Sequence, residues 1–176
     1  MRVKLLASAE LSAHDRHGLR ALWVAAFGGS FADEDEDHAY GGVHAVIREG
    51  SSVVAHASVV PRDLLVGEET LRAGYVEAVA SLPTYQGRGL GTQVMAALGH
   101  VVREQLDLGA LSTSAHGFYE RLGWERWLGP SYVLRAGTRV RTEDEDDGLM
   151  VLRTPGTAEL DLHLPIACHD RPGDAW

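Results

Sequence analysis

The spacing of apolar residues along the chain predicts the elements of secondary structure. Leu19, Leu22 and Trp23 recur at helical spacing behind a candidate N-cap at Ser12, which predicts a helix over 12–27. Apolar positions from Leu90 to Leu106 form one stripe of a second helix, and a short third helix is expected over 115–123. Runs of apolar or alternating residues predict strands at 2–7, 43–49, 51–61, 70–82, 110–114, 124–129, 131–136, 148–154 and 158–166.

Glycine and proline positions indicate where these elements end. The turn at Glu49-Gly50 predicts a β-hairpin, and Pro61 is expected to end its second strand or to place it at a sheet edge. Gly109 is expected to cap the long helix that begins near Leu90. Strands and helices alternate in the middle of the chain, with hairpins at both ends. This order favours a single mixed α/β sheet.

Composition and charge limit the class of protein. At 176 residues the chain is long enough for one well-packed domain, taken as 1–176. Sixteen basic against 25 acidic residues give a formal net charge of −9, which argues against nucleic acid or an anionic membrane as partner. The lone Cys168 suits a reducing compartment, and no apolar stretch approaches the roughly 20 residues that span a bilayer. A cytoplasmic protein is expected.

The stretch "QGRGLG" at 86–91 follows a predicted strand and opens a predicted helix. Backbone N–H groups at such a turn converge on an anion, and the helix N-terminus adds partial positive charge. Gly87, Gly89 and Gly91 let the backbone approach phosphate oxygens, and Arg88 adds a charge-assisted contact. A plain tight turn into a helix remains the alternative. The Walker A sequence is absent, and a Rossmann fingerprint has a different spacing.

The same stretch resembles the cofactor motif of the GCN5-related N-acetyltransferases (GNAT), Q/R-x-x-G-x-G/A, at Gln86, Gly89 and Gly91. The later segment "GFYERLGW" is similar to the tyrosine-bearing segment of that family and contains Tyr119. The resemblance implies the GNAT fold: a single mixed, mostly antiparallel sheet with a splayed central strand pair, flanked by helices. It also implies acetyl-CoA as cofactor and a homodimer as the assembly. The cofactor contacts it implies are Val79, Ala80 and Ser81 on the strand and Gln86, Gly87, Arg88, Gly89, Leu90 and Gly91 in the loop.

A narrower resemblance covers nearly the whole chain and points to the aminoglycoside 2′-N-acetyltransferases. The matching pieces are "GGVHA", "GYVEAV", "LGALSTSA", "GFYERLGW", "EDDG" and "RPGDAW". It implies direct transfer of an acetyl group to the 2′-amine of an aminoglycoside in a ternary complex, which would confer antibiotic resistance. Aminoglycosides are polycations, and carboxylates both neutralise amines and accept their hydrogen bonds.

Two runs of five acidic residues, Asp33–Asp37 and Glu143–Asp147, are candidate walls of that cationic site. Solvated loops are the ordinary interpretation of such runs, and a loop with at most one helical turn is expected around the first. The substrate contacts implied by the resemblance are Asp35, Glu77, the Ala78 carbonyl, Ser112, Glu145, Asp146, Asp174, the carboxylate of Trp176 and Ser30. Family members often carry an acid at the position of Ser30, and the segment between Ser114 and Tyr119 is shorter here.

The resemblance also assigns three catalytic tasks. Glu77 would take the amine proton through a water, although its reference pKa of about 4.3 makes it a weak base. A backbone N–H of the splayed strand, that of Val79, would stabilise the oxyanion. Tyr119 would meet the departing thiolate, with full proton transfer uphill by roughly 2 kcal/mol from reference pKa values. A strong hydrogen bond would suffice.

Two alternative functions are also compatible with this sequence. The enzyme could acetylate another polycation, such as a polyamine or a cell-envelope amino sugar. A catalytically silent acyl-CoA-binding module belongs to a different class, and the retention of Glu77 and Tyr119 argues against it. The histidines show no metal-ligand spacing, so no metal is expected. His44, His56 and His163 alternate with apolar residues and are interpreted as core or sheet-face histidines.

Overall fold

The computed structural model describes residues 1–176, and the chain divides into two compact units. Unit 1 comprises Met1–Val60 and Val76–His100, and unit 2 comprises Pro61–Tyr75 and Val101–Trp176. The long strands β3 (Ser52–Val66) and β4 (Glu69–Ser81) run through both units. The single domain therefore stays a prediction.

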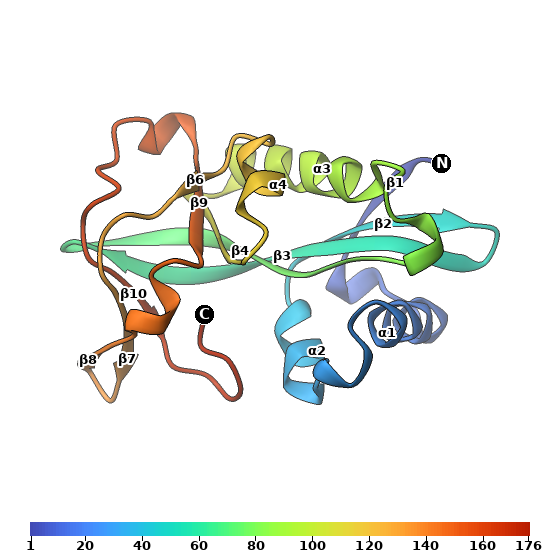
Figure 1. Cartoon of the computed structure of the whole chain (residues 1–176), viewed down its shortest axis with the longest axis horizontal. Helices are drawn as coiled ribbons and strands as arrows, with labels where there is room; N and C mark the ends of the chain where they lie inside the picture. The colour runs from blue at the N-terminus through green and yellow to red at the C-terminus, as the bar shows by residue number, and fades with distance from the viewer. The chain divides into compact units, whose positions relative to one another are not determined.

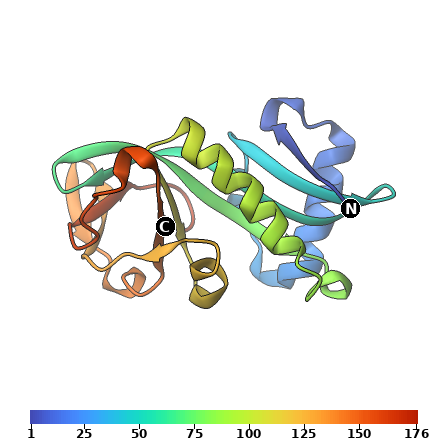
Figure 2. The same cartoon turned by 90° about the horizontal axis from the view of Figure 1, so that it is seen from above.

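Unit 1 contains strands that are covered by helices on both faces. Strand β1 (Val3–Ala7) pairs antiparallel with β2 (Val43–Glu49), and β2 pairs antiparallel with β3 in the predicted hairpin. Helices α1 (Ala13–Phe27) and α2 (Asp33–Ala39) lie on one face of these strands, and α3 (Leu90–Gln105) lies on the other (Figure 1). Seen from above, α3 runs back alongside β4, the strand it follows (Figure 2).

Helix α1 begins where the sequence predicts. The Ser12 side chain accepts the Asp15 N–H at 3.1 Å, and the Asp15 carboxylate accepts the Ser12 N–H at 2.8 Å. This reciprocal cap satisfies N–H groups that have no partner inside the helix. Leu19, Leu22 and Trp23 are fully buried on one face, which confirms the helical spacing.

The first acidic run is a helix of seven residues, so the predicted loop is wrong. Four carboxylates stand in the first turn of α2, where the partial positive charge of the helix N-terminus favours them. Arg20 reaches across from α1 and forms ion pairs with Asp33 and Glu36. The repulsion that argues against a helix in isolation is thus offset by a neighbouring helix.

Pro61 lies inside β3, and the predicted strand end at this residue is also wrong. The β2 ladder leaves β3 at Val59, and the β10 ladder joins it at Leu64. Pro61 falls between the two, so its missing N–H removes no hydrogen bond to β2 or β10. The strand can therefore continue through a proline in the interior of the sheet.

Unit 2 is a mixed arrangement of short strands. Its elements are β5 (Leu108–Ser112), α4 (His116–Glu120), β6 (Glu125–Arg126), β7 (Ser131–Arg135), β8 (Thr138–Arg141), β9 (Leu149–Arg153) and β10 (Ile166–His169). Strand β5 runs parallel to the start of β4 and antiparallel to β9, which also pairs with β6. Strand β10 runs antiparallel to β3 and parallel to β7, and β8 pairs with β7. The predicted mixed α/β sheet is confirmed.

Gly109 does not cap α3, because it lies within β5. A Cβ at this position would come within 2.9 Å of Leu152 Cβ and of the Trp124 ring, so the glycine allows close packing across the sheet. The helix itself ends at Gln105, before the strand begins. The prediction assigned a packing glycine to a turn.

The predicted strand 158–166 is wrong for most of its length. Leu160, Leu162 and Leu164 pack against the core of unit 2, but the backbone turns until β10 begins at Ile166. Their alternation therefore reflects burial without strand pairing. His163 in this segment is exposed beside Asp161, whereas His44 and His56 are fully buried as predicted.

None of the helices has the length and apolar character required to cross a membrane.

Candidate active site

The glycine-rich turn has the geometry of an anion-binding loop. Gly87 and Gly89 adopt positive φ angles of 74° and 73°, on either side of Arg88. Alternation of this kind turns successive N–H groups toward one side of the chain, which forms a concave anion site. No heavy atom lies within 4 Å of a Cβ built at either glycine, so backbone conformation rather than crowding requires them. Leu90 is buried and anchors the first turn of α3 behind the loop.

The Arg88 side chain is held beside this loop by residues that the sequence did not single out. Its guanidinium lies over the Tyr85 ring, 4.7 Å from the ring centroid. The Tyr85 hydroxyl donates to the Glu49 carboxylate on β2. This bond raises the pKa of the Tyr85 hydroxyl, so the phenol stays neutral under the arginine. The three side chains place one cation at the mouth of the loop.

Strand β4 is distorted where Glu77 stands. Ala78 has a φ of 50°, which is uncommon for a residue with a side chain and costs backbone energy. Glu77 is half-buried immediately before it, and Val79 follows it. The parallel ladder between β4 and β5 consists of Ala73–Tyr75 with Leu108–Ala110 and ends before Glu77. The irregular backbone therefore coincides with the residues predicted to carry the chemistry.

The predicted substrate contacts in the first acidic region have partners within unit 1. Asp35 accepts the Ala32 N–H at 2.8 Å and caps α2. Ser30 donates to the Phe27 carbonyl at 2.6 Å, near the end of α1. A carboxylate has further lone pairs, so Asp35 can accept a ligand amine in addition to its cap. The Ser30 hydroxyl donates its only proton to the backbone, so it can serve a ligand only as an acceptor.

Asp146, predicted to contact substrate, is neutralised within unit 2. Its carboxylate accepts from Ser131 N at 2.9 Å and from Ser131 Oγ at 2.7 Å. Arg141 binds both of its oxygens, one of them at 2.8 Å. The arginine and these hydrogen bonds lower the pKa of Asp146 to about 2. An acid with so many internal partners serves the structure of the loop first.

Its neighbour Glu145 has the opposite environment. Ser112 Oγ donates to Glu145 at 3.3 Å, and no arginine or lysine is among the groups that shift its pKa. Partial burial, followed by the negative charge of Asp174, raises the pKa of Glu145. Glu145, Asp174 and Ser112 are three of the predicted contacts that unit 2 brings near one another. Arg171 lies beside Asp174 and donates to its backbone carbonyl at 2.7 Å, but Glu145 has no cationic partner, and a bound cation would offset its repulsion with Asp174.

Tyr119 lies in α4 and is buried, in edge-to-face contact with Phe118 and Trp124. Burial alone raises its pKa to about 12. Trp176 is also buried, and its indole N–H donates to Thr142 Oγ1 at 3.3 Å. The ring of Trp176 thus anchors the segment that carries Asp174. The carboxylate of Trp176 stays a prediction as a substrate contact.

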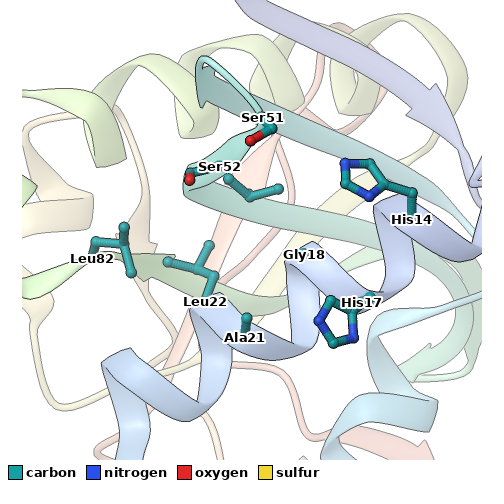
Figure 3. A pocket seen from close by; sticks show the side chains of 9 residues that line it. His14, His17, Gly18, Ala21, Leu22, Ser51, Ser52 and Leu82 are labelled. Atoms are coloured by element: carbon teal, nitrogen blue, oxygen red, sulfur yellow. The ribbon is translucent and has the colours of Figure 1, made fainter.

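Two surface pockets lie away from most of these residues. One of about 260 Å³ lies between α1 and the β2–β3 hairpin, and Figure 3 shows His14 and His17 on one side of it and Ser51, Ser52 and Leu82 on the other. It contains none of the predicted site residues. A second pocket of about 450 Å³ in unit 2 is lined by the Arg141–Asp146 pair, with Trp127. No group of three or more His, Cys, Asp or Glu side chains is arranged to hold a metal ion.

Comparison with known proteins places the chain in one family. A family model described as an acetyltransferase (GNAT) domain matches residues 9–127. The chain belongs to the GNAT family of acetyltransferases.

A more specific relative is an aminoglycoside 2′-N-acetyltransferase from Mycolicibacterium fortuitum. The chain is 44% identical to it over 177 aligned residues, which are 98% of this chain and 91% of the relative. Among solved structures, an Escherichia coli GNAT family N-acetyltransferase (YhbS) in complex with CoA superposes with a TM-score of 0.70 at 17% identity, over 98% of this chain and 94% of that chain. A probable N-acyltransferase from Enterococcus faecalis has a TM-score of 0.60 at 18% identity. That match spans 72% of this chain but only 33% of the larger one.

Proposed function

We propose that the protein acetylates the 2′-amino group of aminoglycosides with acetyl-CoA, by direct transfer in a ternary complex. The observation that carries this proposal is Glu145, a carboxylate beside Asp174 with no cationic partner, in a chain 44% identical to an aminoglycoside 2′-N-acetyltransferase along nearly its whole length. A polyammonium substrate supplies the positive charge that Glu145 lacks. Ser112 adds a hydroxyl beside Glu145 for a sugar oxygen or amine.

The loop 86–91 fits the pyrophosphate of coenzyme A. Gln86, Gly87, Arg88, Gly89, Leu90 and Gly91 would hold it, with the positive φ angles of two glycines shaping the cradle. Val79, Ala80 and Ser81 of β4 would hold the pantetheine arm through their backbone groups. When bound, acetyl-CoA supplies an acetyl thioester whose carbonyl carbon accepts the amine.

Glu77 is proposed to remove the amine proton. A primary amine resembling lysine has a reference pKa near 10.4, so a base or a bridging water must take that proton before attack. Glu77 is half-buried next to the distorted residue Ala78, which turns the strand at this point. The N–H of Val79 would donate to the oxyanion, because it lies on the same strand one residue beyond the distortion.

Tyr119 is proposed to donate a hydrogen bond to the departing thiolate. Its pKa of about 12 exceeds the reference value of about 8.5 for a cysteine-like thiol, so complete proton transfer costs roughly 5 kcal/mol. This is more than the reference pKa values give, because burial disfavours the phenolate. The hydroxyl therefore stabilises the thiolate as a donor and keeps its proton.

The proposal is tested by thiol release from acetyl-CoA over a panel of amines. Turnover is expected with aminoglycosides that carry a 2′-amine and not with matched aminoglycosides that have a 2′-hydroxyl. Efficient turnover of a polyamine or a simple amino sugar, with none for the 2′-amino drugs, would contradict it. Binding of CoA without turnover of any amine would favour a silent binding module.

The role of Glu77 is tested with Glu77→Gln, which removes the base but keeps the size of the side chain. We expect kcat to fall about 100-fold and the acidic limb of the pH–rate profile to disappear. Glu104→Gln, at an exposed position near the end of α3, is the matched control and should leave both unchanged. An unaltered pH profile in the Glu77 variant would remove it as the base.

A further inference from the structure

A series of hydrogen-bonded side chains, from half-buried Ser8 through two buried histidines, leads through unit 1 to the distorted residue of β4. Ser8 Oγ lies 2.7 Å from His44 Nε2, and His44 Nδ1 lies 3.0 Å from His56 Nε2. His56 Nδ1 in turn lies 2.9 Å from the Ala78 carbonyl oxygen. Both imidazoles are fully buried, and burial lowers the pKa of His44 to about 4 and that of His56 to about 3. Each ring is therefore neutral at pH 7 and carries one proton.

The position of that proton follows from the bonds at Ser8. Its Oγ already accepts the N–H groups of Gly41 at 2.9 Å and Gly42 at 3.1 Å. These two donors fill the lone pairs of the hydroxyl oxygen, which leaves its single proton to donate. That proton can reach the Gly42 carbonyl oxygen at 3.1 Å or His44 Nε2 at 2.7 Å, and the shorter contact assigns it to His44. His44 then carries its proton on Nδ1 and donates to His56 Nε2. His56 must carry its own proton on Nδ1, where it faces Ala78.

One contact opposes this order of donors, in which Ser8 donates to His44, His44 to His56 and His56 to Ala78. The Trp23 indole N–H lies 3.2 Å from the same His56 Nδ1 and would need a lone pair there. That arrangement would reverse every bond in the chain. It would give Ser8 Oγ a third donor and would set the Nδ1 lone pair against the Ala78 oxygen at 2.9 Å. The direction from Ser8 to Ala78 uses the three shorter contacts. It leaves the Trp23 N–H without this acceptor and the Gly42 carbonyl without the Ser8 proton.

The Ala78 carbonyl matters because it shares a peptide plane with the Val79 N–H. A trans peptide points these two groups in opposite directions, so a bond that holds the oxygen also aims the N–H. A donor on the carbonyl side also polarises the amide and makes its N–H a stronger donor. The left-handed φ of Ala78 is a conformation that persists only where surrounding groups hold it.

We propose that Ser8, through His44, fixes the tautomer of His56, and that His56 thereby holds the Ala78–Val79 peptide with its N–H directed at the oxyanion. His56 is a positioning residue, because it acts through a backbone amide and touches no substrate. The Ala78 oxygen keeps a second lone pair for the predicted substrate contact. The proposal rests on the proposed function only for the use of the Val79 N–H. The direction of the proton chain stands independently of it.

The direct test is spectroscopic and needs no substrate. Proton–nitrogen correlation spectra of protein labelled with ¹⁵N-histidine distinguish the two neutral tautomers. We expect both buried rings to be protonated on Nδ1, with assignments from His44→Phe and His56→Phe and with exposed His163 as an internal reference. Protonation of either buried ring on Nε2 in the unaltered protein would overturn the proposal. This result holds even if no aminoglycoside is acetylated, in which case only the proposed function fails.

The kinetic test uses Ser8→Ala, which removes the donor at the far end of the chain. Without it, His44 Nε2 loses its donor and the Trp23 N–H competes with the Ala78 oxygen for His56 Nδ1, so part of His56 should switch to the Nε2-protonated form. We expect kcat to fall about tenfold, less than the loss of an oxyanion donor itself, with KM for acetyl-CoA within about twofold. Ser8→Thr keeps a hydroxyl and should restore both the tautomer and the rate. A switched tautomer with unchanged kcat would overturn the positioning role.

A second pair of variants separates the hydrogen bond from packing. In His56→Asn the amide nitrogen takes the place of Nδ1 and can still donate to Ala78. His56→Leu cannot donate. The asparagine variant should retain most of kcat, whereas the leucine variant should lose about tenfold or more. Equal loss in both variants, with normal thermal unfolding, would assign His56 to packing alone.

Discussion

The two acidic runs of this protein look alike in sequence and differ in what neutralises them. In Asp33–Asp37 the first four acids lie in the first turn of helix α2. Arg20 pairs with two of them, and the Asp35 carboxylate caps the helix. In Glu143–Asp147 one arginine, Arg141, takes a single acid and leaves the others. Each run has one arginine for its five acids, but Arg20 bridges two carboxylates of the first run, whereas Arg141 binds one carboxylate of the second and leaves Glu145 without a cationic partner.

The difference is sharpest between two neighbours in the second run. Asp146 has its pKa lowered to about 2 by Arg141 and Ser131, while burial and Asp174 raise that of Glu145. The two adjacent carboxylates therefore differ in effect. Ionised Asp146 stabilises the folded loop, whereas ionised Glu145 is disfavoured unless a cation binds beside it. Charge counted along the sequence does not distinguish them, but the partners of each oxygen do.

The largest expected effect on stability is that of Asp146→Asn. The change removes the ion pair with Arg141, and we expect the free energy of unfolding at pH 7 to fall by about 1–2 kcal/mol after allowance for solvent screening. Denaturant unfolding measures it. Asp144→Asn, at an exposed position in the same run, is the matched control and should change little. Equal effects of the two would erase the contrast between paired and unpaired acids.

Asp146 should also make the free energy of unfolding depend on pH. The pKa of Asp146 is about 2 in the folded protein and about 3.9 when unfolded, so its contribution is complete above pH 4. That contribution is lost as the pH falls toward 2. Unfolding curves between pH 5 and 2 should therefore converge for the unaltered protein and Asp146→Asn. Curves that stay parallel over this range would show that the carboxylate is not paired.

Glu145→Gln is expected to act on binding. Its raised pKa means that ionised Glu145 opposes folding at neutral pH, so the variant should be slightly more stable than the unaltered protein. Loss of one negative charge from the proposed cation-binding site should raise KM for an aminoglycoside about tenfold and leave KM for acetyl-CoA unchanged. Steady-state kinetics with each substrate varied in turn checks this. Reduced stability with unchanged KM would make Glu145 a structural acid like its neighbour.

The smallest effect is expected in the first run. Asp35→Asn weakens the cap of α2, which should lower the free energy of unfolding by about 0.5 kcal/mol. Asp37→Asn lies near the helix C-terminus, where an acid is unfavourable, and should be neutral or slightly stabilising. Thermal unfolding of the two variants compares them. A larger loss from Asp37 than from Asp35 would contradict the capping assignment.

Much of the fold and part of the candidate site could be predicted from local patterns. The cap at Ser12, the buried stripe of α1, the hairpin at Gly50 and the glycine turn before α3 all depend on residues close in sequence. The wrong predictions share a different origin. Local patterns predict a strand end at Pro61 and a helix cap at Gly109, and both predictions are wrong because the ladders around Pro61 and the packing partners of Gly109 are remote in sequence.

The sequence by itself determined the helical and strand periods, the glycine-rich turn at 86–91 and the presence of two acid-rich segments, because these follow from side-chain size, backbone freedom and charge over a few residues. Only the tertiary structure decided which carboxylate Arg141 neutralises, which one Asp174 repels, and which groups lie against the two nitrogens of His56. Each of these outcomes depends on distances of about 3 Å between residues far apart in the chain. The energies of hydrogen bonds and ion pairs weaken beyond such distances, and the folded structure sets these distances.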